Sequence, residues 1–251
     1  MVKKQKEVKI FSFDIETMAN TGYYFQLYKE GNIVQNIEHW YMISFAWKWL
    51  GEKETHVLAL PDFKSYKKNK KDDKELAYEL WKKFDEADIV IAHNGQAFDV
   101  KKANALFLKH GFQPPSPYKV VDTKLVAKRY FRFDSNKLDD LADFLKIGRK
   151  LQTGGFQLWL DCENGIKKAW DKMKEYNKHD VVLLEKVYLR MVPFISAHPT
   201  LNRTFVQKPE CRECQSRHMH SRGVEISKGY ARNKFNCRDC GAWTLSEKIL
   251  T

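Results

Sequence analysis

The sequence has no long hydrophobic run and no tract of low complexity. Its first eleven residues are rich in lysine, and the apolar stretch that follows is interrupted by Asp14 and Glu16. A signal peptide needs an unbroken apolar segment, and a membrane span needs about 20 predominantly apolar residues, so the sequence predicts neither. We therefore expect a soluble, cytoplasmic protein with no membrane partner.

Cysteine is scarce, with 5 residues, and four of these form two pairs near the C-terminus: Cys211-x2-Cys214 and Cys237-x2-Cys240. In a chain without a secretion signal, paired CxxC motifs favour a metal over disulfides. Four thiolates complete a tetrahedral Zn²⁺ site and leave no open position, so we expect one structural zinc in a zinc ribbon. Cys162 is left over and is expected to be inert.

Acidic residues are outnumbered by basic ones: the sequence has 44 Lys and Arg but 32 Asp and Glu, which gives a formal net charge of +12. Lys and Arg gain free energy by releasing counterions from phosphates, so this balance favours a nucleic-acid partner. A basic surface that serves only solubility is the alternative. Residues 64–74 hold six lysines and no Ile, Leu or Val, and are expected to form a solvated loop, with a phosphate-contacting loop as the alternative.

The 251 residues, 43% of them hydrophobic, suffice for one medium domain and a small appendage. Apolar patterns predict strands at 8–13, 42–49, 55–60, 89–92 and 118–121, with the first strand ending at the first carboxylates. Helical spacing predicts helices that begin near residues 76, 100, 138 and 176. Three antiparallel strands followed by alternating strands and helices indicate an α/β fold, a mixed five-stranded sheet flanked by helices. We expect domains at 1–200 and 201–251, joined by a proline-containing linker.

Four acidic residues and a tyrosine lie at or near the ends of these elements. Asp14 and Glu16 are two apart, so a strand would point both to one face. Asp99 falls in the first turn of the helix after the fourth strand, where it would also serve as an ordinary N-cap. Tyr176 and Asp180 lie on the same side of the last helix. Each segment alone is weak evidence, but the combination is specific.

In this order and spacing, residues 8–192 resemble the DEDD exonuclease superfamily, which has an RNase H-like fold. The resemblance favours the DEDDy branch, because the His of the other branch would fall where Glu175 stands. The Asn94-x4-Asp99 spacing and the segment Val121-Asp122-Thr123 are more similar to exonuclease domains of family B DNA polymerases than to RNase D. The resemblance makes Asp122 structural.

The resemblance implies a catalytic set and two divalent metal ions. Asp14 would bridge both ions, Glu16 and Asp180 would hold the nucleophile-side ion, and Asp99 would position the second. Independently of the resemblance, clustered acids repel one another unless cations neutralise them, and hard oxygen ligands select Mg²⁺ or Mn²⁺. Tyr176, with an ordinary pKa of about 10, suits the role of a donor that orients the attacking water.

Residues beside these acids are expected to bind the substrate, since single strands are commonly bound through stacking of their bases on protein side chains. The candidates are Thr17, Met18, Asn94 and Phe98. Core packing is the alternative for Phe98.

The resulting hypothesis is a 3′→5′ exonuclease that hydrolyses single-stranded DNA ends to nucleoside 5′-monophosphates by a two-metal-ion mechanism. The zinc ribbon would bind the substrate or a replication protein. RNase D-like 3′ processing of RNA is an alternative, because the same metal site cleaves either backbone. A second alternative is that the protein is an inactive module that only binds nucleic acid. The sequence is compatible with a bacterial or a viral source.

Overall fold

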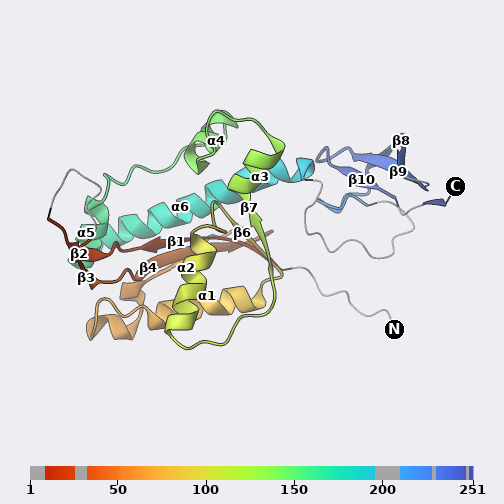
Figure 1. Cartoon of the computed structure of the whole chain (residues 1–251). Coiled ribbons are helices and arrows are strands. Elements are labelled where there is room, and N and C mark those ends of the chain that lie inside the picture. The colour runs from red at the N-terminus through yellow and green to blue at the C-terminus, as the bar shows by residue number, and fades with distance from the viewer. Residues whose placement is uncertain (1–8, 26–32, 196–209, 228–229, 247–248, 251) are drawn as a thin grey trace.

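A mixed five-stranded sheet forms the centre of the computed structural model, which describes residues 9–25, 33–195, 210–227, 230–246 and 249–250 (Figure 1). The strand order is β5-β4-β1-β6-β7. The strands are β1 (Ile10–Thr17), β4 (Met42–Trp49), β5 (His56–Ala59), β6 (Ile89–Ala92) and β7 (Lys119–Asp122). β1 runs antiparallel to β4 and parallel to β6. This arrangement confirms the predicted mixed sheet.

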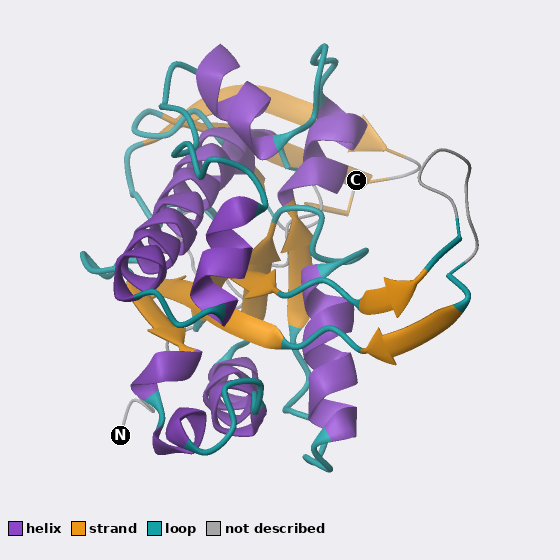
Figure 2. Cartoon of the chain, turned by 90° about the vertical axis from the view of Figure 1, so that its left-hand side faces the viewer, coloured by secondary structure: helices purple, strands orange, loops and turns teal. Residues whose placement is uncertain are grey.

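Helices cover both faces of the sheet (Figure 2). On one face, α1 (Lys74–Glu86) and α2 (Asp99–Lys109) pack against alternate side chains of β1, such as Phe11 and Phe13. The other face carries α3 (Thr123–Tyr130), α4 (Leu138–Phe144) and α6 (Lys167–Met191). Helix α5 (Gln157–Glu163) packs beside α6. Phe11, Phe13 and Ile15 of β1 point to the first face, and Ile10 packs on the other, so that beyond Ile10 the second face of the strand carries polar side chains.

Several boundaries differ from those predicted. β1 does not end at the first carboxylates but continues through Asp14 and Glu16 to Thr17, because β4 pairs with it along this whole length. Helix α6 begins at Lys167, nine residues before the predicted start. The lysine-rich stretch begins with the short 3₁₀ helix Lys64–Lys67, and another 3₁₀ helix, Leu60–Asp62, comes directly before it. The sequence analysis did not predict α3, α5 or the hairpin of β2 (Thr21–Tyr23) and β3 (Gln35–Glu38). A third 3₁₀ helix, Val192–Phe194, follows α6.

The C-terminal part is a small antiparallel sheet with β9 (Tyr230–Cys237) at its centre. Its other strands are β8 (Met219–Ser227), β10 (Trp243–Leu245) and β11 (Ile249–Leu250). The predicted domain boundary at residue 200 falls within 196–209, outside the described residues, as does the predicted start of the first strand at Val8. None of the helices in the described ranges is both long enough and apolar enough to cross a membrane.

Buried polar contacts fix α6 against the sheet. Lys48 of β4 forms an ion pair with Glu185 of α6, and the two side chains are only 14% and 8% exposed. Nearby, the Ser44 hydroxyl donates a hydrogen bond to the side-chain oxygen of Asn177, at 3.0 Å. Since charges and hydroxyls removed from water need their partners, these contacts set the rotation of α6 about its axis.

We expect Lys48→Met to lower the free energy of unfolding by about 3–5 kcal/mol, because Glu185 would remain buried without its partner. The double variant Lys48→Met/Glu185→Met should lose less, since both charges are gone. Urea unfolding measures both. Lys167→Met, in the exposed pair with Asp171, serves as the control and should change stability by less than about 1 kcal/mol. Equal losses in the single and double variants would contradict a stabilising role for the buried pair.

Candidate active site

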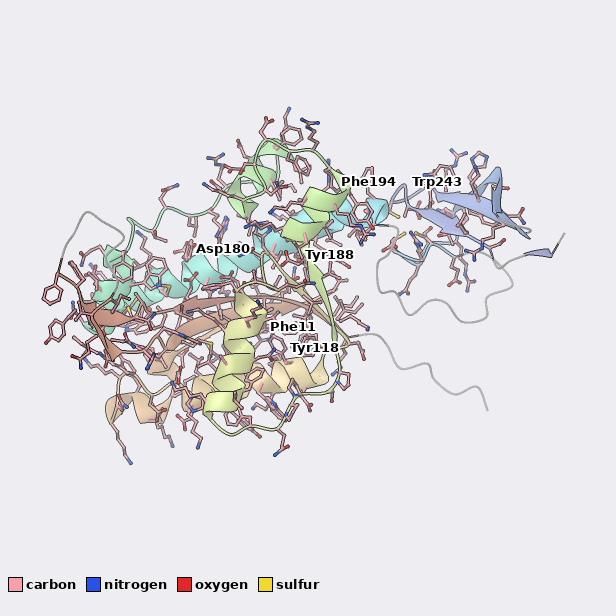
Figure 3. All side chains as sticks on the ribbon, in the orientation of Figure 1. Phe11, Tyr118, Asp180, Tyr188, Phe194 and Trp243 are labelled. Atoms are coloured by element: carbon pink, nitrogen blue, oxygen red, sulfur yellow. The ribbon has the colours of Figure 1, made fainter. Side chains whose placement is uncertain are left out.

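Three carboxylates meet where α6 crosses β1. Asp14 and Glu16 point to the α6 side of β1, while Phe13 and Ile15 enter the opposite core. Asp180 lies on α6 and is 1% exposed (Figure 3). The ligand oxygens of Asp14, Glu16 and Asp180 all lie within 4.8 Å of one another. Oxygens on opposite sides of an octahedral Mg²⁺ are about 4 Å apart, so the cluster has the dimensions of a cation site.

Asp99 reaches the same edge from β6, whose carboxyl end lies beside that of β1 because the two strands are parallel. The chain turns sharply between β6 and α2. Asn94 has a φ of 65°, and a Cβ on Gly95 would lie 2.3 Å from that of Ala92. Asp99 then opens α2, and its buried carboxylate is hydrogen-bonded by the backbone of Ile15. It is outside the group of three, but its charge acts on both Asp14 and Glu16.

Burial raises the pKa of every carboxyl group in the cluster, and repulsion between these groups adds to it for Asp14 and Glu16. Burial comes first for Asp14, whose pKa lies well above its usual range, with Glu16 adding repulsion. Burial and then Asp180 raise the pKa of Glu16 to about 8. Burial also raises the pKa of Asp99 to about 6, and that of Asp180. Carboxyl groups in this state are stabilised in their ionised form by cations.

Lys150 supplies a positive charge that the sequence analysis missed. Its Nζ lies 2.6 Å from Oδ2 of Asp180 and 3.4 Å from the Tyr176 hydroxyl. Lys150 lies in the segment between α4 and α5, which has neither helical nor strand periodicity, so the sequence pattern gives no sign that this lysine faces the site. The other oxygen of Asp180, Oδ1, is buried and has no hydrogen-bond partner. A buried carboxylate oxygen without a hydrogen-bond partner, on a residue clustered with two further acids, fits the donor set of a hard divalent cation.

Tyr176 stays neutral in this setting. Burial, followed by repulsion from Asp180 and Glu16, raises the pKa of its phenol above the ordinary value of 10. It therefore keeps its proton at neutral pH and acts as a hydrogen-bond donor.

Asn177, which the sequence analysis also missed, positions Asp14. Its amide nitrogen donates to Oδ2 of Asp14 at 2.7 Å, while Ser44 holds its amide oxygen. Asn177 is fully buried. Asn177 stands three residues before Asp180 on the face of α6 that is otherwise apolar. A polar residue on such a face was the sign in the sequence that Asn177 has a buried polar partner.

The expected substrate-binding residues have different environments. Thr17 accepts a hydrogen bond from Lys102 Nζ at 3.1 Å, and Phe98 is exposed. The side-chain oxygen of Asn94 accepts from Lys124 at 3.2 Å. Met18 is 4% exposed and belongs to the hydrophobic core.

Asp122 accepts hydrogen bonds from four backbone N–H groups, those of Asn94, Gln96, Lys124 and Leu125. It caps α3 and holds the turn that leads to Asp99.

The four paired cysteines converge in the C-terminal sheet. The Sγ atoms of Cys211 and Cys240 are 3.4 Å apart, and those of Cys214 and Cys237 are 3.5 Å apart. Each CxxC motif is followed directly by a residue with positive φ, which is Gln215 after Cys214 and Gly241 after Cys240. The N–H group of that residue donates to the backbone carbonyl of the first cysteine of the motif, Cys211 or Cys237. Thiolates around a tetrahedral Zn²⁺ are about 3.8 Å apart, so the cluster fits one structural zinc.

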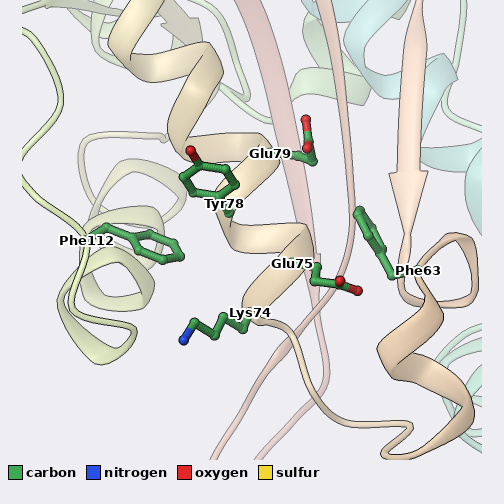
Figure 4. A pocket seen from close by; sticks show the side chains of 6 residues that line it. All are labelled: Phe63, Lys74, Glu75, Tyr78, Glu79 and Phe112. Carbon is green, nitrogen blue, oxygen red and sulfur yellow. The ribbon is translucent and has the colours of Figure 1, made fainter.

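A cavity of about 400 Å³ lies away from the carboxylates, on the outer side of α1 (Figure 4). It is lined by Phe63, Lys74, Glu75, Tyr78, Glu79 and Phe112. None of these residues belongs to the carboxylate cluster.

We expect Asn177→Leu to weaken Mn²⁺ binding about 10- to 100-fold, because Asp14 would lose the donor that orients it. A Mn²⁺ titration followed by thermal unfolding measures the effect. Asn164→Leu, at the exposed end of α5, is the matched control and should leave the titration unchanged. A folded Asn177→Leu protein with the parent's Mn²⁺ affinity would rule out the positioning role.

Without divalent ions, the protein should lose stability as the pH rises from about 5 to about 8. The folded-state pKa of Glu16, about 8, exceeds its ordinary value of 4.5, so the native state binds the additional proton in this window. Urea unfolding at several pH values should show this slope, and Glu16→Gln should flatten it. Mg²⁺ should stabilise the parent protein more at pH 8 than at pH 5. An identical slope in the variant would show that another group titrates.

Comparison with known proteins places this site in a family. No curated protein sequence matches the chain significantly. Among solved structures, a family B DNA polymerase from the hyperthermophilic archaeon Pyrobaculum calidifontis has a similar fold, with a TM-score of 0.54 at 14% identity. The match covers 75% of this chain, and the chain spans 25% of that polymerase. A model of the RNase_H superfamily matches residues 11–192, which include the four carboxylates and Tyr176. The chain therefore belongs to the RNase_H superfamily.

Proposed function

We propose that the protein is a metal-dependent 3′→5′ exonuclease that acts on single-stranded DNA. The observation that carries this proposal is the meeting of Asp14, Glu16 and Asp180 within 4.8 Å at the sheet edge that Asp99 also reaches. Membership of the RNase_H superfamily supports nuclease chemistry in general. The 3′→5′ direction rests on the resemblance of these residues and Tyr176 to the DEDDy exonucleases.

Asp14, Glu16, Asp99 and Asp180 would hold two Mg²⁺ or Mn²⁺ ions. Such ions, when bound, supply a nucleophile at neutral pH and stabilise the charge on the departing oxygen. The fit rests on the all-oxygen donor set and the unpartnered Oδ1 of Asp180.

The residues of the chain then have distinct tasks in phosphodiester hydrolysis. The neutral phenol of Tyr176 donates a hydrogen bond that orients the attacking water. Lys150, held on Asp180, places a positive charge beside the negative phosphate. Asn177 keeps Asp14 in a fixed orientation. Water adds to phosphorus as the bond to the 3′-oxygen breaks, which releases a nucleoside 5′-monophosphate and leaves a new 3′-hydroxyl on the shortened strand.

RNA is the alternative substrate, because only contacts to the 2′-hydroxyl distinguish the two backbones. We also propose that residues 201–251 form a separate zinc ribbon that assists binding to nucleic acid or to a replication protein.

The test uses Mg²⁺ and 5′-labelled single strands of DNA and RNA with the same sequence. We expect a ladder that shortens from a free 3′ end and is absent when that end is blocked. Asp14→Ala should lose about a thousandfold or more in rate, because several kcal/mol of transition-state stabilisation depend on the metal site.

Glu175→Ala is the matched control, since Glu175 is an exposed acid next to Tyr176, and it should keep the parent's rate. Preferential shortening of the RNA would favour the exoribonuclease alternative. Binding of both strands without shortening of either would replace the enzyme by a binding module.

A further inference from the structure

The hairpin of β2 and β3 exposes an unusual amount of apolar surface. We define the β2–β3 ribbon as residues 21–25 and 33–38, which project from the side of the main body (Figure 2). All six of its large apolar side chains are more than half exposed, and Phe25 reaches 90%. They are Tyr23, Tyr24, Phe25, Ile33, Val34 and Ile37.

The exposed side chains lie in the paired strands and directly beside them. Tyr23 is the last residue of β2, and Tyr24 and Phe25 follow it. Ile33 and Val34 precede β3, and Ile37 lies within it. A hairpin that covers a core would bury one of its faces, but within the described residues of the ribbon neither face buries a large apolar side chain. Exposed apolar surface of this kind marks a binding surface.

The ribbon is an extension of the strand that carries the catalytic carboxylates. β1 ends at Thr17, and β2 begins at Thr21. Between them, Met18 N–H donates to the carbonyl of Tyr41, and Trp40 N–H donates to the side chain of Asn20. These bonds continue the pairing of β1 with β4 past Asp14 and Glu16, so the ribbon projects from the active-site edge of the sheet.

A cluster of rings and one cation connects the ribbon with the carboxylates. The ammonium of Lys102 lies 3.8 Å from the ring centre of Trp40, at the base of the ribbon, and 4.9 Å from that of Phe98. It also donates to Thr17, directly after the strand's two acids. Phe98 precedes Asp99 in the chain. Aromatic faces with an interleaved cation therefore reach from the ribbon to the acids.

We propose that the β2–β3 ribbon binds the single strand upstream of the nucleotide that is being removed. The bases stack on Tyr23, Tyr24 and Phe25, and Lys102 contacts the phosphate between ribbon and active site. Stacking on aromatic rings suits single strands of any sequence, because every base has a π face. Glu38 is the only acid among the ribbon's described residues, and Lys71 pairs with it at 2.5 Å, which limits repulsion of phosphates. The inference rests on the proposed exonuclease function.

The test compares the parent with Tyr23→Ser/Tyr24→Ser/Phe25→Ser, which changes exposed side chains and should keep the parent's stability in urea. Binding is measured in an Asp14→Ala background, so that it is independent of catalysis, with fluorescently labelled dT3 and dT12. We expect the triple variant to bind dT12 about tenfold or more weakly and dT3 as the parent does. Phe144→Ser, another exposed aromatic on α4, is the control and should bind both as the parent does.

Hydrolysis of the p-nitrophenyl ester of thymidine 5′-monophosphate separates this inference from the proposed function. This substrate has no upstream base, so the triple variant should hydrolyse it at the parent's rate in the catalytically intact protein. If the parent hydrolyses neither the ester nor a strand, the proposed function fails, whatever the binding result. Equal binding of dT12 by parent and triple variant would overturn the ribbon proposal alone. So would a parent that sediments as a dimer and a triple variant that sediments as a monomer, because the ribbon would then join two copies of the chain.

Discussion

The structure depends on the burial of like charges at one edge of a sheet. Asp14, Glu16, Asp99 and Asp180 converge there, and burial raises the pKa of each. Such a cluster opposes folding unless rigid neighbours hold it and compensate part of the charge. β1 provides the rigidity, because it pairs with β4 along its length and with β6 at its start. The compensation comes from the Asn177 amide, the backbone of Ile15 and the Lys150 ammonium.

Helix α6 contributes Tyr176, Asn177 and Asp180 to the site, and the face of the helix that carries Asn177 and Asp180 also packs against the sheet. Met173 and Leu184 of its inner face are fully buried apolar residues. Where the helix crosses β1 and β4, the same face carries Asn177 and Asp180 instead. The polar groups are matched by polar groups of the sheet, Asn177 by Ser44 and Asp14, and further along Glu185 by Lys48. The polar contacts that hold the helix therefore include those that orient Asn177 and, through it, Asp14 in the candidate site.

The sequence predicted what depends on local pattern. Strands 42–49 and 89–92 were predicted at their observed bounds, since their apolar runs are distinct. The three acidic segments were found because their order and spacing together resemble the DEDD exonucleases, whereas each segment alone is weak evidence. The predicted end of β1 was wrong because pairing with β4 extends the strand to Thr17, and no local sequence pattern reveals that pairing. Lys150 and Lys102 were missed because tertiary contacts alone bring them to the site. The β2–β3 ribbon lacks a buried face, so it has no clear strand alternation.

Charge balance explains why Lys150 belongs in a site built for cations. Four ionised carboxylates and one ammonium leave three negative charges, too many for a buried cluster, which accounts for the raised pKa values. Two divalent ions would reverse this to one positive charge, and the single negative charge of a phosphodiester would bring the sum to zero. Lys150 has contacts that do not depend on Asp180, since its backbone N–H donates to Asp139 and its ammonium lies over the Tyr176 ring. It could therefore remain if cations took the carboxylate oxygens, and under the proposed function the assembly of protein, ions and substrate, rather than the protein alone, would be electrically neutral.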